Sequence, residues 1–110
     1  MRVIFNHTLC SLKILCLNNR YLGMVRQWQQ IFYNGNYSHV GMEWTPDFVK
    51  LAEAYGAVGL RARHPAELTA VLEKGFATRG TVVMDIHVEQ EENVFPMVPP
   101  GAGINEMVLS

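Results

Sequence analysis

Short apolar runs alternate along the chain with stretches whose apolar residues recur at helical spacing. The run 12–17 (LKILCL) is mostly apolar and stops at Asn18 and Asn19, which predicts a buried strand followed by a turn. The runs 57–62 (AVGLRA) and 81–88 (TVVMDIHV) predict two further strands. In the last run the apolar side chains fall on one face: Val82, Met84, Ile86 and Val88.

The first predicted helix spans 23–32 (GMVRQWQQIF) and begins near 21–23. The turn residues 34–36 (NGN) close this helix. Four of its side chains share one side of the helix: Met24, Gln27, Trp28 and Ile31.

The second predicted helix begins at Thr45, Pro46 and Asp47. Thr45 suits the cap, Pro46 the first helical position and Asp47 the first turn. Gly56 ends this helix. Its apolar face is expected to comprise Phe48, Leu51, Ala52 and Tyr55.

The third predicted helix opens at His64 and Pro65, and Gly80 follows its end. Its apolar face carries Leu68, Val71 and Leu72. The resulting order of elements, β-α-α-β-α-β, predicts a parallel α/β sheet with right-handed crossovers. The stretch 89–110 contains three prolines and two glycines and predicts an irregular, extended tail.

Composition narrows the class of protein. With 110 residues and nine basic against ten acidic side chains, the chain is one domain at most and has no basic stripe for nucleic acid. No window is apolar enough for a membrane span, and polar residues interrupt the apolar N-terminal stretch, so neither a membrane segment nor a signal peptide is expected. Cys10 and Cys16 form no CxxC motif; we expect Cys16 to be a buried thiol in a reducing, cytoplasmic setting.

The strongest candidate for chemistry is the pair Asn18 and Asn19. Ligands of parallel α/β sheets bind at the carboxyl ends of the strands, where the pair lies. An asparagine oxygen there is a ligand for Mg²⁺, or else the pair caps the turn into the next helix. Gly23 likewise suits either a close approach to a phosphate or a tight turn.

The remaining candidates are the apolar residues of the first predicted helix, the histidines and Asp85. Met24, Val25 and Trp28 either line a pocket or pack on the sheet. The four histidines have no metal-ligand spacing, which favours structural or surface roles: His7, His39, His64 and His87. Asp85 is expected to be a strand residue near a partner and not a catalytic acid, and no residue is assigned as catalytic. The sequence lacks a Walker loop, a GxGxxG motif and a zinc pattern.

Two stretches carry a resemblance to a known family. The stretch 13–61, which contains LNNRYLGMVRQWQ, resembles the thiamine-diphosphate-binding domain of the acetolactate synthase large catalytic subunits. The stretch 92–107 (ENVFPMVPPGAGINEM) resembles the C-terminal tail of the same subunits. The resemblance covers about residues 12 to 110 and implies a three-layer, parallel-sheet thiamine-diphosphate-binding fold.

This resemblance implies roles for individual residues. Asn19 would bind Mg²⁺ through its side chain and Tyr21 through its backbone carbonyl. Leu22, Gly23 and Met24 would border the cofactor. The residues expected to line or cover the substrate entrance are Val25, Trp28 and Pro100.

The sequence also departs from the family. The family's diphosphate motif begins with Gly-Asp-Gly, which this sequence lacks, so the charged metal ligand is missing. Residues 1–11 look atypical, 12–88 look like a partial α/β domain truncated at its N-terminus, and 89–110 form the tail. The domain that supplies the activating glutamate and the FAD-binding domain of the parent enzyme have no counterpart in the sequence.

By resemblance, the parent enzyme condenses pyruvate with a second 2-oxo acid, such as 2-oxobutyrate, in the branched-chain (isoleucine and valine) pathway. It forms a homodimer or tetramer and binds a regulatory small subunit. We expect these 110 residues to be inactive alone. Two alternatives remain open: a non-catalytic module that self-associates, and part of another thiamine-diphosphate-dependent oxo-acid decarboxylase or oxidase.

Overall fold

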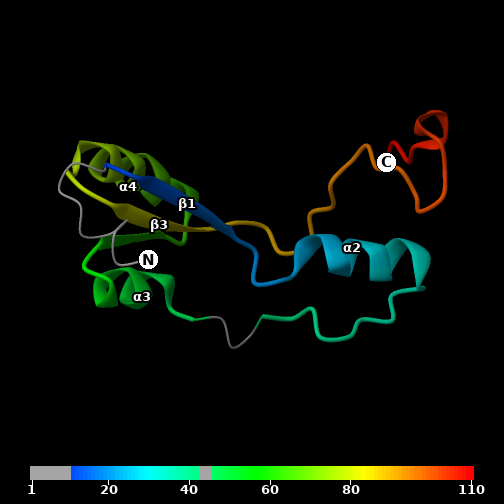
Figure 1. Ribbon diagram of the computed structural model, residues 1–110, viewed down its shortest axis with the longest axis horizontal. Coiled ribbons are helices and arrows are strands. Elements are labelled where there is room, and N and C mark those ends of the chain that lie inside the picture. Colours follow the sequence, from blue (N-terminus) through cyan, green and yellow to red (C-terminus); the bar gives the residue numbers. More distant parts are fainter. Residues whose placement is uncertain (1–10, 43–45) are drawn as a thin grey trace. The chain divides into compact units, whose positions relative to one another are not determined.

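The computed structural model describes residues 11–42 and 46–110, which belong to two compact units. The first unit comprises Met1–Asn19 and Glu43–Glu89, and the second comprises Arg20–Met42 and Gln90–Ser110. Figure 1 shows the ribbon of both units. Each unit is described separately below.

The first unit contains a three-stranded sheet. Its strands are β1 (Lys13–Asn18), β2 (Val58–Ala62) and β3 (Val82–His87), in the order β1-β3-β2. Both neighbouring pairs are parallel, which confirms the predicted parallel sheet. Because β3 is central, its side chains are the most completely buried of the three strands.

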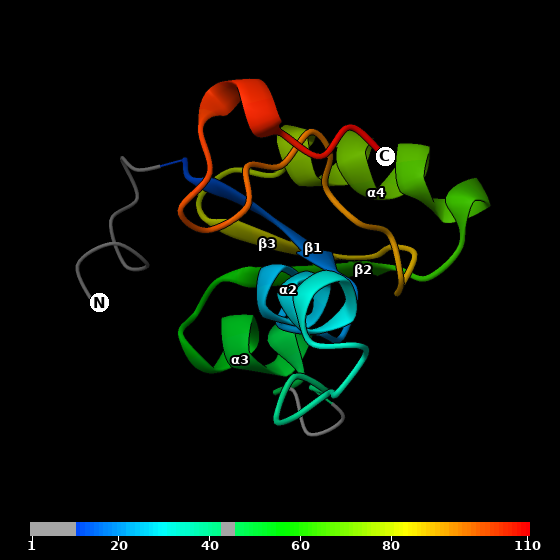
Figure 2. The same ribbon diagram turned by 90° about the vertical axis from the view of Figure 1, so that its right-hand side faces the viewer.

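Two helices cover opposite faces of this sheet (Figure 2). They are α3 (Phe48–Ala54) and α4 (Pro65–Ala77), and both contact β2 and β3. The three-layer arrangement implied by the resemblance is therefore confirmed. The core lies between α4 and β3, and it contains Val82, Met84 and Ile86 with Leu60, Leu68, Val71 and Leu72 packed against them.

The opposite face of the sheet accepts α3 closely because β2 carries a glycine there. A Cβ added to Gly59 would lie 2.7 Å from the backbone oxygen of Val49 and 2.8 Å from its Cα. These contacts are with backbone atoms of α3, so they cannot be relieved by turning a side chain. Gly59 therefore sets the distance between α3 and the sheet.

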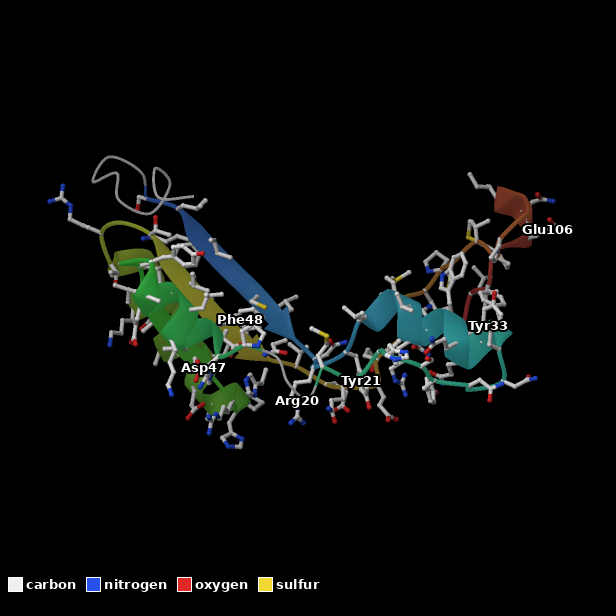
Figure 3. The ribbon with its side chains drawn as sticks, turned by 60° about the horizontal axis from the view of Figure 1, so that its bottom comes forward. Arg20, Tyr21, Tyr33, Asp47, Phe48 and Glu106 are labelled. Carbon is white, nitrogen blue, oxygen red and sulfur yellow. The ribbon has the colours of Figure 1, made fainter. Side chains whose placement is uncertain are left out.

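The start of α3 corrects one prediction. Asp47 is the N-cap, and its carboxylate accepts hydrogen bonds from the backbone N–H of Val49 at 3.1 Å and of Lys50 at 3.2 Å. Asp47 is thus outside the helix and not in its first turn, because its short carboxylate satisfies the N–H groups that the first turn leaves unpaired. Figure 3 labels Asp47 beside Phe48, the first helical residue. The predicted cap, Thr45, lies outside the described residues.

The strand β1 corrects a second prediction, that it is buried. Among the described strands it pairs with β3 alone, and Leu15 and Leu17 are 44% and 68% exposed. Cys16 is half-buried and not buried, for the same reason. The apolar run predicted a strand correctly, but it did not show that the strand has one neighbour among the described strands. Val88 likewise lies beyond β3 and is exposed.

A lysine on β1 connects this edge strand to the rest of the unit. The ammonium group of Lys13 donates to the carbonyl oxygens of Thr78 at 2.5 Å and of Gly80 at 2.7 Å. Thr78 is the C-cap of α4, so the positive charge meets the carbonyl end of the helix, where cations are favourable.

A buried carboxylate joins all three strands on the α3 face. Asp85 is 2% exposed and lies directly opposite Cys16 on β1 and Arg61 on β2. It accepts from Arg61 Nε at 3.0 Å and from Asn18 Nδ2 at 3.0 Å, and His87 Nε2 lies 3.4 Å away. The expectation that Asp85 has a partner is confirmed.

The same arginine extends this cluster to α3. Arg61 Nη2 donates to Asp47 Oδ1 at 2.5 Å, so one guanidinium bridges the capping carboxylate and the buried one. The pKa of Asp47 is lowered, first by the backbone N–H of Lys50 and then by Arg61. The pKa of Arg61 is raised, chiefly by its hydrogen bond to Asp47. Both groups therefore stay charged at neutral pH, and the bridge is ionic.

We predict that Gly59→Ala lowers the free energy of unfolding by about 1–3 kcal/mol, because the added methyl group would overlap the backbone of α3. Chemical denaturation measures this loss. The control is Gly41→Ala, since nothing lies within 4 Å of a Cβ at Gly41. Equal stability of the two variants would contradict the close approach at Gly59.

We also predict that Arg61→Met lowers the free energy of unfolding by about 3–5 kcal/mol, because Asp85 would remain buried without its cation. Arg63→Met is the control, because the side chain of Arg63 is exposed beyond the end of β2. If Arg61→Met does not fold, Arg61→Lys retains the charge and should lose less stability. A loss no larger than that of the control would argue against the cluster.

Candidate functional site

The carboxyl end of β1 distinguishes between its two asparagines. The side-chain amide nitrogen of Asn18 donates to the carboxylate of Asp85. Through this bond the side chain of Asn18 contacts the central strand β3, and it does not cap the following helix, which has Leu22 as its N-cap and no side-chain capping bond. The backbone carbonyl oxygen of Asn18 accepts from the backbone N–H of Val88 at 3.2 Å. Asn19 follows the strand, is half-buried, and is the residue of the pair that stays a candidate ligand.

The second unit begins with a tight conformation before its helix. Arg20 has φ 60°, in the left-handed region that residues other than glycine seldom occupy. Tyr21 then forms an isolated antiparallel bridge with Gly41, as Leu22 N–H donates to Val40 O at 2.9 Å and Met42 N–H to Arg20 O at 2.8 Å. Because the flanking residues make both bonds, the peptide groups of Tyr21 point away from Gly41. Figure 3 labels Arg20 and Tyr21 in this segment.

The helix α2 (Gly23–Phe32) follows, with the bounds predicted from the sequence. Leu22 is its N-cap and makes no side-chain capping bond. Gly23 is the first helical residue, and its φ is not in the positive range, so neither of the two roles considered for it is settled. The turn at Asn34 and Gly35 has φ values of 52° and 73°, which confirms the expected end of the helix.

The apolar side of α2 decides between the two interpretations of its side chains. Met24, Val25 and Trp28 are exposed and do not pack in a core. Together with Gln29 and Tyr33 they line an open, mainly apolar pocket of about 430 Å³. Figure 3 labels Tyr33 at the end of the helix. The alternative that these three side chains line a pocket is the one that the structure supports.

The buried side chains of α2 are instead polar. Arg26 is 7% exposed, and its guanidinium lies 5.0 Å from the centre of the Tyr21 ring and 4.9 Å from that of Tyr37. It donates to Gln30 Oε1 at 3.0 Å and forms an ion pair with Glu91 at 3.4 Å. Sequence reasoning missed this residue, because an arginine on an amphipathic helix is usually exposed to solvent. In the sequence, the available signal for the burial of Arg26 was the presence of Tyr21 and Tyr37.

The tail contains little regular secondary structure. Met97 and Val108 form an antiparallel bridge, with backbone bonds of 2.9 and 2.7 Å, and a short 3-10 helix, η1, spans Ile104–Glu106. The tail is otherwise irregular, as predicted. Pro100 is exposed and is not among the residues that line the α2 pocket.

The described residues contain no group of three or more histidine, cysteine, aspartate or glutamate side chains that could hold a metal ion. Any ion bound by these parts of the chain therefore requires other oxygen ligands. The pKa of the Cys16 thiol is raised, first by burial and then by the nearby Asp85 carboxylate, which makes it a poor nucleophile. None of the helices in the described ranges is long and apolar enough to cross a membrane.

Comparison with known proteins identifies the family. Residues 3–86 match the model described as thiamine pyrophosphate enzyme, C-terminal TPP binding domain. This match includes most of the segment 1–11, which the sequence analysis set apart, and it stops before the tail.

Individual relatives agree with this match. The chain is 47% identical over 98 residues to the acetolactate synthase large subunit of Haemophilus influenzae. It is 46% identical over 100 residues to the acetolactate synthase isozyme 3 large subunit of Escherichia coli. It is also 46% identical over 96 residues to the mitochondrial acetolactate synthase catalytic subunit of Saccharomyces cerevisiae.

These alignments cover 87–88% of this chain but only 14–17% of each relative. The chain thus spans less than a fifth of the length of the curated relatives that it matches. The resemblance to acetolactate synthase large subunits expected from the sequence is confirmed. The chain belongs to the family of the C-terminal TPP-binding domain of thiamine pyrophosphate enzymes.

Proposed function

We propose that this chain supplies the diphosphate and magnesium side of the thiamine-diphosphate site of an acetolactate synthase. The complete enzyme would condense pyruvate with a second 2-oxo acid, such as 2-oxobutyrate, in isoleucine and valine synthesis. The family match over 3–86, together with identities of 46–47% to acetolactate synthase subunits, supports this proposal. We place the enzyme in the cytoplasm.

The asparagine pair supports the ligand roles within this proposal. Ligands of parallel α/β sheets bind beyond the carboxyl ends of the strands, and Asn19 is the residue that directly follows β1. Asn19 would give Mg²⁺ its side-chain oxygen and Tyr21 its carbonyl oxygen. Both are neutral, and Mg²⁺ normally takes one or two carboxylates together with phosphate oxygens. The two oxygens fit the ion only with the diphosphate and a further ligand.

The residues of α2 would form the boundary of the cofactor and the substrate entrance. Thiamine diphosphate, when bound, supplies the carbon nucleophile for oxo-acid chemistry. Leu22, Gly23 and Met24 would border the cofactor, and Val25 and Trp28 would line the entrance. Their exposed apolar side chains can exclude water from a ligand that covers them.

Further components of the complete enzyme belong to this proposal as well. We propose FAD as a cofactor of its central domain, a homodimer or tetramer as its assembly, and a regulatory small subunit as its partner. Pro100 would lie in the tail segment that covers the entrance. The 110 residues by themselves would have no catalytic activity, since they contain neither Gly-Asp-Gly nor an assigned catalytic residue.

A second candidate function is self-association without catalysis. It is favoured by the exposed apolar side chains of the α2 pocket in one unit and of β1 in the other. Exposed apolar patches of this kind mark surfaces that associate.

For the first function, we predict Mg²⁺-dependent binding of thiamine diphosphate no tighter than about 1 mM, because two neutral oxygens hold the ion weakly. Calorimetric titration in Mg²⁺ and in EDTA measures it. Asn19→Ala should abolish the Mg²⁺-dependent part, whereas the control Asn36→Ala, in the exposed turn after α2, should retain it. Undiminished binding in Asn19→Ala would contradict the ligand role, and turnover of pyruvate by the purified chain would contradict its inactivity.

For the second function, we predict that the chain sediments as a dimer or larger species at micromolar concentration. Trp28→Glu should shift it toward monomer by placing a charge among the apolar side chains of α2. Glu92→Gln changes a charge elsewhere on the exposed surface and is the control. A monomer across the whole concentration range would remove this candidate.

A further inference from the structure

One side chain on α2 binds the tail as a strand edge would. Gln27 Nε2 donates to the carbonyl oxygen of Val94 at 2.7 Å, and Gln27 Oε1 accepts from the N–H of Val94 at 2.9 Å. Gln27 Nε2 also contacts Met97 Sδ at 3.2 Å. The primary amide of Gln27 therefore pairs with both the N–H and the carbonyl oxygen of Val94, and its nitrogen makes a second contact, with Met97 Sδ. The helix α2 and the tail both belong to the second unit.

The same helix uses the same device on its other flank. Gln29 Nε2 donates to the carbonyl oxygen of Ser38 at 3.2 Å, and Gln29 Oε1 accepts from the N–H of Ser38 at 3.1 Å. This second pair is exposed to solvent, whereas Gln27 is only 1% exposed. Figure 1 shows the tail and the loop 33–42 running along opposite sides of α2.

Two weaker contacts accompany the Gln27 pair. Arg26 forms its ion pair with Glu91, whose side chain is 69% exposed, and Asn93 Nδ2 donates to Gln30 Oε1 at 3.2 Å in an exposed position. Contacts of this kind contribute little, because water competes for the exposed Glu91 carboxylate and for the exposed Asn93–Gln30 pair. The buried Gln27 amide differs, since leaving a buried donor or acceptor unpaired carries the full cost of its desolvation.

We propose that Gln27 is the positioning residue that fixes the tail on α2, by recognising Val94 through its backbone alone. The pairing holds the tail in one register, in which Val94 offers both its N–H and its carbonyl oxygen to the amide while Met97 Sδ lies 3.2 Å from the same Nε2. The contact between Gln27 and the tail does not depend on the proposed function. Only its consequence rests on that function: the tail segment that carries Pro100 would reach the substrate entrance in a register set by Gln27.

The sharpest test replaces the amide by its isostere in Gln27→Glu. An ionised carboxylate accepts from the N–H of Val94 but repels the Val94 carbonyl oxygen, so the tail should detach at neutral pH. A protonated carboxyl group has one O–H donor and an acceptor oxygen, so it can form both bonds to Val94, although it cannot also make the contact of the amide with Met97 Sδ. Its pKa should lie above the usual value of about 4.3, because burial disfavours the charged form. The pairing should therefore return as the pH falls.

Hydrogen exchange of the Val94 amide, expressed as a protection factor in the full chain at pH 7.5 and at about pH 5, is the readout. At the higher pH, Gln27→Glu should reduce protection of Val94 about tenfold or more. Protection should recover at the lower pH. The unsubstituted chain, measured at both values, separates this recovery from the effects of other titrating groups.

Two further variants complete the test. Gln27→Met cannot form either bond and should lose the protection of Val94 at both pH values. Gln29→Glu should reduce the protection of Ser38 and leave that of Val94 unchanged. Full protection of Val94 in Gln27→Met, or equal loss in Gln27→Glu at both pH values, would overturn the proposal. No cofactor or activity enters this readout, so it can fail or succeed independently of thiamine-diphosphate binding.

Discussion

A single buried carboxylate determines how the first unit is assembled. Asp85 lies on the central strand, and a charge in that position is tolerated only when it is fully paired. Its partners come from both neighbouring strands, Asn18 on one side and Arg61 on the other. Arg61 in turn holds the carboxylate that caps α3. Asp85 thereby links the two outer strands to the central one and, through Arg61, the sheet to the cap of α3.

The second unit is held together differently. Its helix buries Arg26 and Gln27 and leaves Met24, Val25 and Trp28 exposed, the reverse of an ordinary amphipathic helix. The buried Gln27 amide satisfies both peptide groups of Val94 in the tail, and the more exposed Gln29 amide does the same for Ser38 in the loop after the helix. The apolar residues are consequently left at the surface, where a cofactor, a substrate or another polypeptide can cover them.

The sequence was sufficient for the elements and the parallel order, because period and turn residues are local properties. The bounds of α2 and the opening of α4 at His64 and Pro65 were correct for this reason. The burial of Gln27 was not predictable, since it depends on the tail, 67 residues further along the chain. The family resemblance, by contrast, came from the specific stretch that follows Asn18. The ligand roles of Asn19 and Tyr21 stay predictions.

The connection between β1 and β3 bears on how this chain folds during synthesis. β2, α4 and β3 follow one another directly and can form from local contacts, whereas Lys13 reaches partners 65 and 67 residues further on. Contacts of such separation form slowly, because a long loop must be closed first. Within this stretch, β1 is synthesised before β3 and can gain its neighbour only once β3 is complete. Leu15 and Leu17 stay 44% and 68% exposed even after that pairing, so this strand carries apolar surface open to other chains at every stage of folding.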